Sequence, residues 1–406
     1  MSTAPSRPAA ASDTVLAPLW LMALALVAVA ANLRTSIASV PPLVGTIASD
    51  LHLSSAWIGA LTTLPVLCMG LFAPVAQRLG ARLGAVAAVE VSVVCVGVGT
   101  AMRFWGDHVW ALYLGTFAGG VGIAIGGTLL PGLVKGLFPP RRAGLVTGLY
   151  MFAMMGGAAA ASALAVPLAG WLGSWQASLA SWSVLALVGA LAWAPLTLRA
   201  ARHRAANPPV GAAAHGLPWR ESTAWLVAAY LAVQSWEFYS SLAWIAPSYV
   251  DRGWDPTTAG YLLSVFSGTQ LVSGLVGPAL TDRIHDHRAL LLPAAALATL
   301  GLLGLLVAPD AAAWVWVAVL GLGQGASFSL ALVLLVDYAA TPAASGRLAA
   351  MAFFISYTIA SFGPASMGAV RDLTHGFHAI WAVLTALMAA QIGFVLMMRP
   401  DLRRTH

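Results

Sequence analysis

Long apolar segments recur along the whole chain, separated by short stretches that hold most of the charged residues. Twelve of these segments have about the 20 residues that a helix needs to cross the hydrocarbon core of a bilayer. They cover residues 15–40, 56–77, 84–102, 109–134, 143–170, 177–197, 222–247, 260–281, 289–308, 312–336, 347–369 and 378–398. The pattern predicts an all-α polytopic membrane protein with twelve transmembrane helices.

One connection differs from the others in length and composition. Residues 198–221 are rich in Arg, Pro and Ala, which is typical of a linker. We therefore expect two six-helix bundles, an N-terminal one over 15–197 and a C-terminal one over 222–398, joined by a cytoplasmic linker over 198–221. Residues 1–14 and 399–406 would then be cytoplasmic tails.

The composition agrees with a membrane protein. Hydrophobic residues make up 60% of the 406 residues and charged residues 8%, with a mean hydropathy of +0.84. Soluble domains carry about 25% charged residues, so a soluble globular protein is excluded, and the hydrophobicity excludes a disordered chain. Two cysteines exclude a disulfide scaffold and a cysteine-ligated metal cluster. The net charge of +6 comes from scattered residues, so we expect that the protein binds no nucleic acid. We expect a monomer in a lipid bilayer.

The basic residues are distributed asymmetrically. Sixteen of the twenty Lys and Arg residues lie in connections on one side of the predicted helices, whereas Arg103, Arg252 and Arg371 lie on the other. Basic loops remain in the cytoplasm, so we expect both termini to be cytoplasmic and the protein to lie in the cytoplasmic (inner) membrane. A cleavable signal peptide is the alternative interpretation of the first segment, but the even helix count and the charge bias oppose it.

The two halves of the chain resemble each other at an offset of about half its length. Pro74 and Arg78 end the second segment, as Pro278 and Arg283 end the eighth. Chance similarity between helices rich in Ala, Leu and Gly is the alternative. Six plus six helices in a parallel repeat is the arrangement of major facilitator transporters.

Specific strings sharpen this interpretation. The chain contains NLR (32–34), SVPPL (39–43), LTTLPVLCMGLFAP (61–74), LLPGLVKGLFP (129–139), DRGWDPTTAG (251–260) and GLGQGASF (321–328). With them it resembles the cyanate transporter and 2-nitroimidazole exporter family of the major facilitator superfamily, over nearly the whole chain. The resemblance implies the twelve-helix fold and the passage of small polar or planar solutes.

The sequence departs from the family pattern at three places. Thr128 lies near the position where an Asn is expected before the Leu-Leu-Pro string, and Glu237 stands where the pattern is apolar. Gln77 replaces the Asp that normally precedes Arg78, whereas the second half keeps Asp282 and Arg283. We predict that Arg78, Asp282 and Arg283 form a conformational latch on the cytoplasmic side.

Arg34 is the basic residue inside a predicted helix. A charge at the bilayer centre costs at least about 2.5–3.5 kcal/mol, and a guanidinium offers a planar fork of donors to a small anion, a nitro group or a carboxylate. We predict that Arg34 binds the substrate; the alternative is a structural arginine bonded to backbone carbonyls where Pro41 and Pro42 break the helix. Asn32 is a weaker candidate, with a role between helices as its alternative.

Two acids lie inside predicted helices. Glu237 lies at a depth similar to that of Arg34 in the corresponding helix of the second half. We predict that it contacts substrate, pairs with Arg34 and carries a coupled proton; a permanent structural pair is the alternative. Glu90 is a second proton-coupling candidate, with a contact to a neighbouring helix as its alternative.

A transport site also needs a few oriented polar groups on an apolar wall. The further substrate-binding candidates are neutral, and packing between helices is the alternative for each. They are Gln234, Tyr239, Gln324, Thr128, Tyr150 and Tyr357. Met151, Met154 and Met155 are expected to pack.

Three classes of function remain. We favour a secondary active transporter that moves a small polar, anionic or planar solute by alternating access. Coupling of this transport to protons is left open at this point. The chain has no nucleotide-binding loop, and we expect no cofactor or metal. A membrane enzyme is disfavoured because the spans lack a nucleophile–base pair and a metal-binding constellation. A transporter-like sensor or binding protein without net flux is the remaining alternative.

Overall fold

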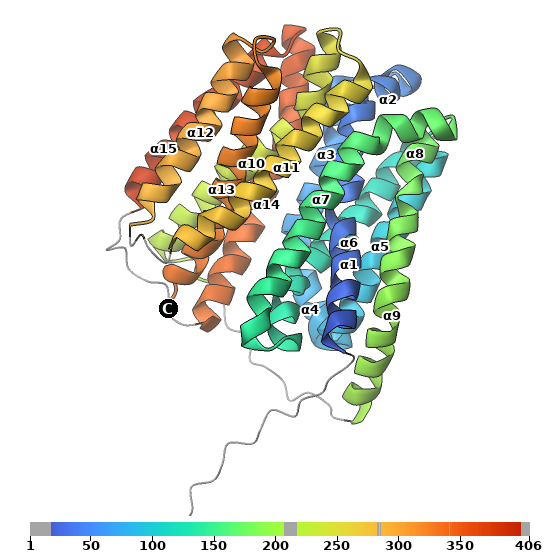
Figure 1. Ribbon diagram of the computed structural model, residues 1–406, viewed down its shortest axis with the longest axis vertical. Coiled ribbons are helices and arrows are strands. Elements are labelled where there is room, and N and C mark those ends of the chain that lie inside the picture. Colours follow the sequence, from blue (N-terminus) through green and yellow to red (C-terminus); the bar gives the residue numbers. More distant parts are fainter. Residues whose placement is uncertain (1–17, 207–216, 282–283, 285, 341, 399–406) are drawn as a thin grey trace, which may run out of the picture.

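The computed structural model describes residues 18–206, 217–281, 284, 286–340 and 342–398, and its elements are all helices (Figure 1). In chain order they are α1 (Leu19–Ala38), the 3-10 turn η1 (Pro41–Leu43), α2 (Val44–Leu51), α3 (Ser55–Leu71), α4 (Ala73–Leu83), α5 (Ala85–Met102), the 3-10 turn η2 (Arg103–Trp105), α6 (Val109–Leu137), α7 (Pro140–Leu172), α8 (Trp175–Ser181), α9 (Ser183–Ala206), α10 (Ser222–Asp251), α11 (Pro256–Thr281), α12 (Arg288–Val307), α13 (Ala313–Asp337), α14 (Pro342–Thr374) and α15 (His378–Met397).

Each of the twelve predicted segments overlaps a helix of the structure. Ten helical spans among the described residues are long and apolar enough to cross a membrane, and α3 with α4, bent by 55°, would make eleven. The 30-residue α10 does not reach the same hydropathy because Gln234, Ser235 and Glu237 interrupt it. Multi-pass membrane insertion is therefore supported, and the count of twelve crossings stays a prediction.

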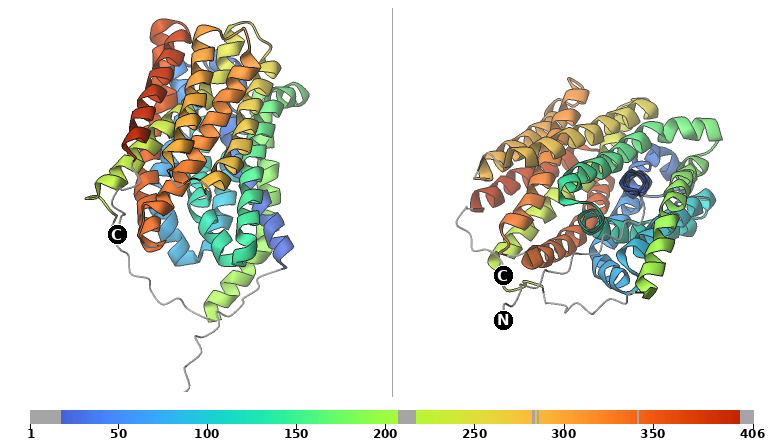
Figure 2. Two further views of the ribbon diagram at one scale, coloured as in Figure 1. Left: turned by 60° about the vertical axis from the view of Figure 1, so that its left-hand side comes forward. Right: turned by 60° about the horizontal axis from the view of Figure 1, so that its bottom comes forward.

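The long helices run between two ends of the molecule. We call the end where α1 begins and α15 ends the terminal face, and the opposite end, where α10 and α14 finish, the distal face (Figure 1). Helices α1–α9 form one group and α10–α15 another, and the two groups lie side by side in Figure 1 and in the right-hand view of Figure 2. The predicted bundle limits stay a prediction, although α9 continues to Ala206 and makes the start of the expected linker helical.

Close backbone contacts join the two groups near the distal face, where α3 packs along α14. A Cβ atom added at Gly59 of α3 would overlap the backbone of Pro364, and one added at Gly368 of α14 would overlap the backbone of Ser55. Trp244 of α10 donates from Nε1 to the Pro364 carbonyl at 2.9 Å. Glycine at these positions therefore allows the groups to approach more closely than side chains would permit.

Large apolar side chains cover the outside of the molecule. Trp171, Val307 and Leu191 are 80%, 77% and 66% exposed, values that would be unusual for a contiguous surface in water. Trp20, Trp105 and Trp110 are also exposed near helix ends, as expected for aromatic residues at membrane–water interfaces. This surface is suited to lipid.

The first span is broken where the sequence predicted. After Ala38, Pro41 and Pro42 form η1 and the chain continues as α2, so the apolar span runs from Leu19 to Leu51. Arg34 therefore lies near the middle of the span but only one turn before the break. The break positions the last turn of α1 beside the centre of the molecule.

Candidate functional site

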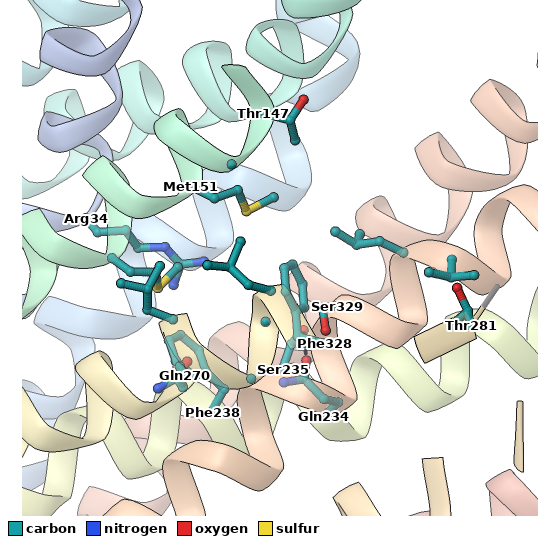
Figure 3. A pocket seen from close by; sticks show the side chains of 18 of the residues that line it. Arg34, Thr147, Met151, Gln234, Ser235, Phe238, Gln270, Thr281, Phe328 and Ser329 are labelled. Atoms are coloured by element: carbon teal, nitrogen blue, oxygen red, sulfur yellow. Dashed lines mark hydrogen bonds between the residues drawn. The ribbon is translucent and has the colours of Figure 1, made fainter. Parts of the chain in front are cut away.

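A cavity of about 670 Å³ lies between the two groups of helices (Figure 3). Its lining reaches from Arg34 of α1 to Thr281, His287 and Asp337, which lie at helix ends of the terminal face. Met151, Met155 and Phe328 contribute apolar walls. A largely apolar cavity with a few convergent polar groups is the usual form of a small-molecule site.

Arg34 points into this cavity from α1 (Figure 3). Its side chain is 8% exposed, and its guanidinium carbon lies 5.0 Å from the ring centre of Phe238 and 5.6 Å from that of Tyr239. Its buried Nη1 atom has no hydrogen-bond partner within the part of the chain that the structure describes. The rings orient the guanidinium by cation–π contact. A buried donor without a partner costs free energy that a bound acceptor would recover, which makes Arg34 a candidate to hold a ligand.

Helix α10 forms the wall that faces Arg34. Gln234, Ser235, Phe238 and Tyr239 line the cavity from this helix. The Tyr239 hydroxyl donates to Sδ of Met69 at 3.5 Å, and its ring lies 6.3 Å from the ring of Tyr357, which lines the cavity from α14. The structure thus brings four predicted site residues together: Arg34, Gln234, Tyr239 and Tyr357.

Glu237 lies behind this wall instead of in it. It is fully buried, does not line the cavity, and accepts a hydrogen bond from Nε2 of Gln324 on α13 at 3.3 Å. Among the described residues no ion pair joins Glu237 to Arg34, so the predicted pair is wrong for this conformation. Successive residues of a helix point in directions about 100° apart, and α10 accordingly turns Phe238 and Tyr239 towards Arg34 and Glu237 towards α13.

The remaining predicted site residues lie outside the cavity lining. Asn32 donates to the carbonyls of Ala28 and Leu185 at 2.7 and 3.2 Å and joins α1 to α9, the alternative role that its position allowed. Thr128 donates to the Ala124 carbonyl of its own helix at 2.7 Å. Tyr150 is part of the apolar core of the first group of helices. Glu90 accepts from Thr197 at 3.3 Å between α5 and α9.

The predicted cytoplasmic latch stays a prediction, because Asp282 and Arg283 lie outside the described residues. Its third member, Arg78, is exposed on α4. At the opposite, distal face, the structure shows contacts of charged side chains that join the two groups. The Asp372 carboxylate accepts from the backbone N–H groups of Ser55 and Ala56 at 3.1 and 3.0 Å.

Arg371 reinforces this contact, which we call the distal clamp (Ser55, Ala56, Asp251, Arg371 and Asp372). It donates to Oγ of Ser55 at 2.8 Å and pairs with Asp251 at 3.0 Å. A carboxylate at the first turn of α3 also interacts favourably with the helix dipole. The cavity is therefore closed at the distal face and reaches towards the terminal face.

Charged groups gather at the mouth of the cavity on the terminal face. Nε2 of His287 lies 2.6 Å from Oδ2 of Asp337, and both residues line the mouth. Beside them, hydrogen bonds from Arg288 hold the pKa of the Asp286 carboxyl below its usual value. The Asp337 carboxylate thus lies at the mouth beside His287, while the Arg34 guanidinium lies at the inner end.

Sequence reasoning missed two features of this site. Arg103, counted among the loop charges, is 1% exposed and donates to the Ser36 carbonyl at 2.6 Å and to Oγ1 of Thr116 at 3.3 Å, which holds the end of α1 next to Arg34. Met151 and Met155 were expected to pack but line the cavity. The position of Arg103 directly after the predicted apolar segment 84–102 was the available signal for burial.

Comparisons with known proteins agree with this architecture. The family model of the Major Facilitator Superfamily matches residues 21–364 and 231–405. The chain is 34% identical over 378 residues to the transporter YycB of Bacillus subtilis, covering 92% of this chain and 90% of that protein. It is 31% identical to the 2-nitroimidazole transporter of Escherichia coli (89% and 91% covered) and 30% identical to the cyanate transport protein CynX of that organism (94% and 99%). A solved D-xylose-proton symporter has a TM-score of 0.71 at 15% identity, with 95% and 98% covered.

Proposed function

The chain is a membrane transporter that belongs to the Major Facilitator Superfamily, and from that premise we propose that it carries a small anion or a planar nitro or carboxylate compound as a secondary active transporter. One observation carries the proposal: Arg34 lines the cavity with a guanidinium nitrogen that is buried and has no hydrogen-bond partner among the described residues, while the lining carboxylate, Asp337, lies at the mouth. A cyanate ion and a nitro group both accept hydrogen bonds from such a fork.

The proposal includes alternating access. The cavity extends to the terminal face, and the distal clamp holds α3 against α14 at the other face. Rocking of the two groups about the cavity would break the clamp and close the mouth. The charge bias of the loops assigns the terminal face, and with it both termini, to the cytoplasm of the inner membrane, so this conformation would face inward.

The proposal also includes proton coupling at Glu237. It is a fully buried acid in the helix that forms the cavity wall, and an ionisable residue at this depth of a membrane protein marks a functional site by default. Glu90 lies away from the cavity lining, beside Thr197, and is the second candidate for the same role.

Flux measurements on the purified protein in liposomes test the proposal. We expect uptake of radiolabelled cyanate or of 2-nitroimidazole, saturable and accelerated by unlabelled compound inside the vesicles. The comparison variant is Arg34→Met, which keeps an unbranched apolar stem and removes the guanidinium fork. Binding without flux would favour the alternative of a sensor, and the absence of both for each compound would overturn the proposed substrate class.

A further inference from the structure

Glu237 is connected to the cavity through a single amide side chain. Nε2 of Gln324 donates to Oε2 of Glu237 at 3.3 Å. Oε1 of the same Gln324 accepts from Nε2 of Gln234 at 3.0 Å. Gln234 lines the cavity, whereas Gln324 and Glu237 are fully buried behind it. A chain of two hydrogen bonds therefore runs from the cavity wall to the buried acid.

The Gln324 amide is oriented by both of its partners. An amide offers an oxygen acceptor at one end and an NH₂ donor at the other, and here the oxygen faces Gln234 while the NH₂ group faces Glu237. If Gln234 withdraws its donor, the Gln324 oxygen loses its partner and the amide is free to turn. Turning the amide would remove the donor from the Glu237 carboxylate.

The Glu237 carboxylate depends strongly on that donor. Its Oε1 atom is without a hydrogen-bond partner among the residues described. The helices packed around it present neutral groups: Gln324 and Ser327 from α13, and Gln391 from α15 beside Tyr230. Tyr230, two turns earlier in α10, is a titratable group that the charge of Glu237 would affect, and Arg34 lies on the cavity side of α10.

We propose that Gln324 is a positioning residue that links occupancy of the cavity to protonation of Glu237. An anion held by Arg34 would accept the Gln234 N–H groups, the Gln324 amide would turn away from Glu237, and the carboxylate would take up one proton from solvent. Anion and proton would then move together. This inference rests on the proposed transport function and adds to it the residue that couples the two sites.

Two matched variants test the inference. Gln324→Met keeps an unbranched side chain of similar size but removes both hydrogen bonds. Gln176→Met makes the same change in α8, outside the cavity lining, at a side chain whose Nε2 donates to Oδ1 of Asp107. The probe is radiolabelled cyanate, measured in exchange without a gradient and in accumulation driven by a pH gradient.

We expect Gln324→Met to exchange cyanate within about threefold of the wild type and to lose accumulation driven by the pH gradient. Gln176→Met should keep both. Accumulation by Gln324→Met equal to that of the wild type would overturn the inference. If the methionine variant does not fold, Gln324→Asn serves instead, because the shorter amide remains polar but cannot span both partners.

Infrared spectroscopy provides a readout that a merely structural role would not change. The carbonyl band of a neutral carboxylic acid, assigned to Glu237 by its loss in Glu237→Gln, should grow when cyanate is added to the wild type and to Gln176→Met. It should not respond to cyanate in Gln324→Met. Cyanate flux in the wild type with no such band and no proton movement would overturn the inference and leave transport intact. Absence of flux would instead count against the proposed function.

Discussion

Replacing Arg34 with lysine separates the charge of this residue from its geometry. Both side chains are cationic, but lysine has one compact ammonium group in place of a planar fork. The rings of Phe238 and Tyr239, at 5.0 and 5.6 Å, hold the guanidinium in the cavity, and its Nη1 atom lacks a protein partner among the described residues. We therefore expect a bound planar anion to use two donors of Arg34 and only one of a lysine.

The expected loss follows from that one bond. A hydrogen bond to a charged group contributes about 1.5–3 kcal/mol, and each 1.4 kcal/mol changes the dissociation constant tenfold. Arg34→Lys should therefore weaken binding by about 10- to 100-fold. Arg34→Met, which also removes the charge, should weaken it further.

Calorimetric titration of cyanate or 2-nitroimidazole into the detergent-solubilised protein measures this loss. Arg78→Lys is the matched control, because Arg78 is exposed on α4 outside the cavity lining and its replacement should leave the dissociation constant unchanged. Wild-type affinity in Arg34→Lys together with weak binding in Arg34→Met would show that charge alone matters and refute the two-donor geometry. Wild-type affinity in both would remove Arg34 from the site.

Three further predictions concern the surrounding structure. Asp372→Asn weakens the hydrogen bonds to the first turn of α3, so spin labels at the distal ends of α3 and α14 should report a larger share of long distances; an unchanged distribution would contradict the distal clamp. Arg103→Met leaves the Ser36 carbonyl without its buried donor, which costs about 1–3 kcal/mol and should lower the unfolding temperature. Gly115→Ala places a Cβ atom against the backbone of Gly99, whereas Gly119→Ala meets open space; the first should destabilise by about 1–3 kcal/mol and the second should be nearly neutral, and equal unfolding temperatures would refute this packing.

The helices were predictable because each apolar run must satisfy its backbone hydrogen bonds internally once it is in lipid. Their ends were less predictable: α9 continues to Ala206 through residues that looked like a linker, since Ala and Arg favour helix as readily as they occur in linkers. Asp372 was not predicted to join the two halves, because its partners are two backbone N–H groups 316 and 317 residues away, and backbone groups carry no sequence signal.

The candidate site, too, was predictable only in part: its charged residues could be identified from the sequence, but the direction of each side chain could not. Arg34 was identifiable from its charge alone, because a guanidinium inside a span costs free energy and therefore marks a functional site by default. Glu237 was identifiable for the same reason, but its direction was not: the period of a helix states which residues share a face, and not which face meets the neighbouring group. Gln234 and Glu237 both bond Gln324, but Gln234 also lines the cavity that Arg34 enters, whereas Glu237 is turned towards α13.

Helix α10 falls short of the hydropathy of the other long helices, yet it supplies four residues of the cavity lining. A charged residue at the bilayer centre costs about 2.5–3.5 kcal/mol on insertion scales, and α10 adds Gln234 and four buried serines to that cost. The cost is reduced because most of α10 is buried against α11, α13, α14 and α15, where Gln234 bonds Gln324 and Trp244 bonds the Pro364 carbonyl. A helix with a purely structural role would satisfy the same contacts with apolar residues at lower cost. The polarity of α10 is therefore best explained by what lies on its two sides, the cavity that faces Arg34 and the buried acid that faces α13.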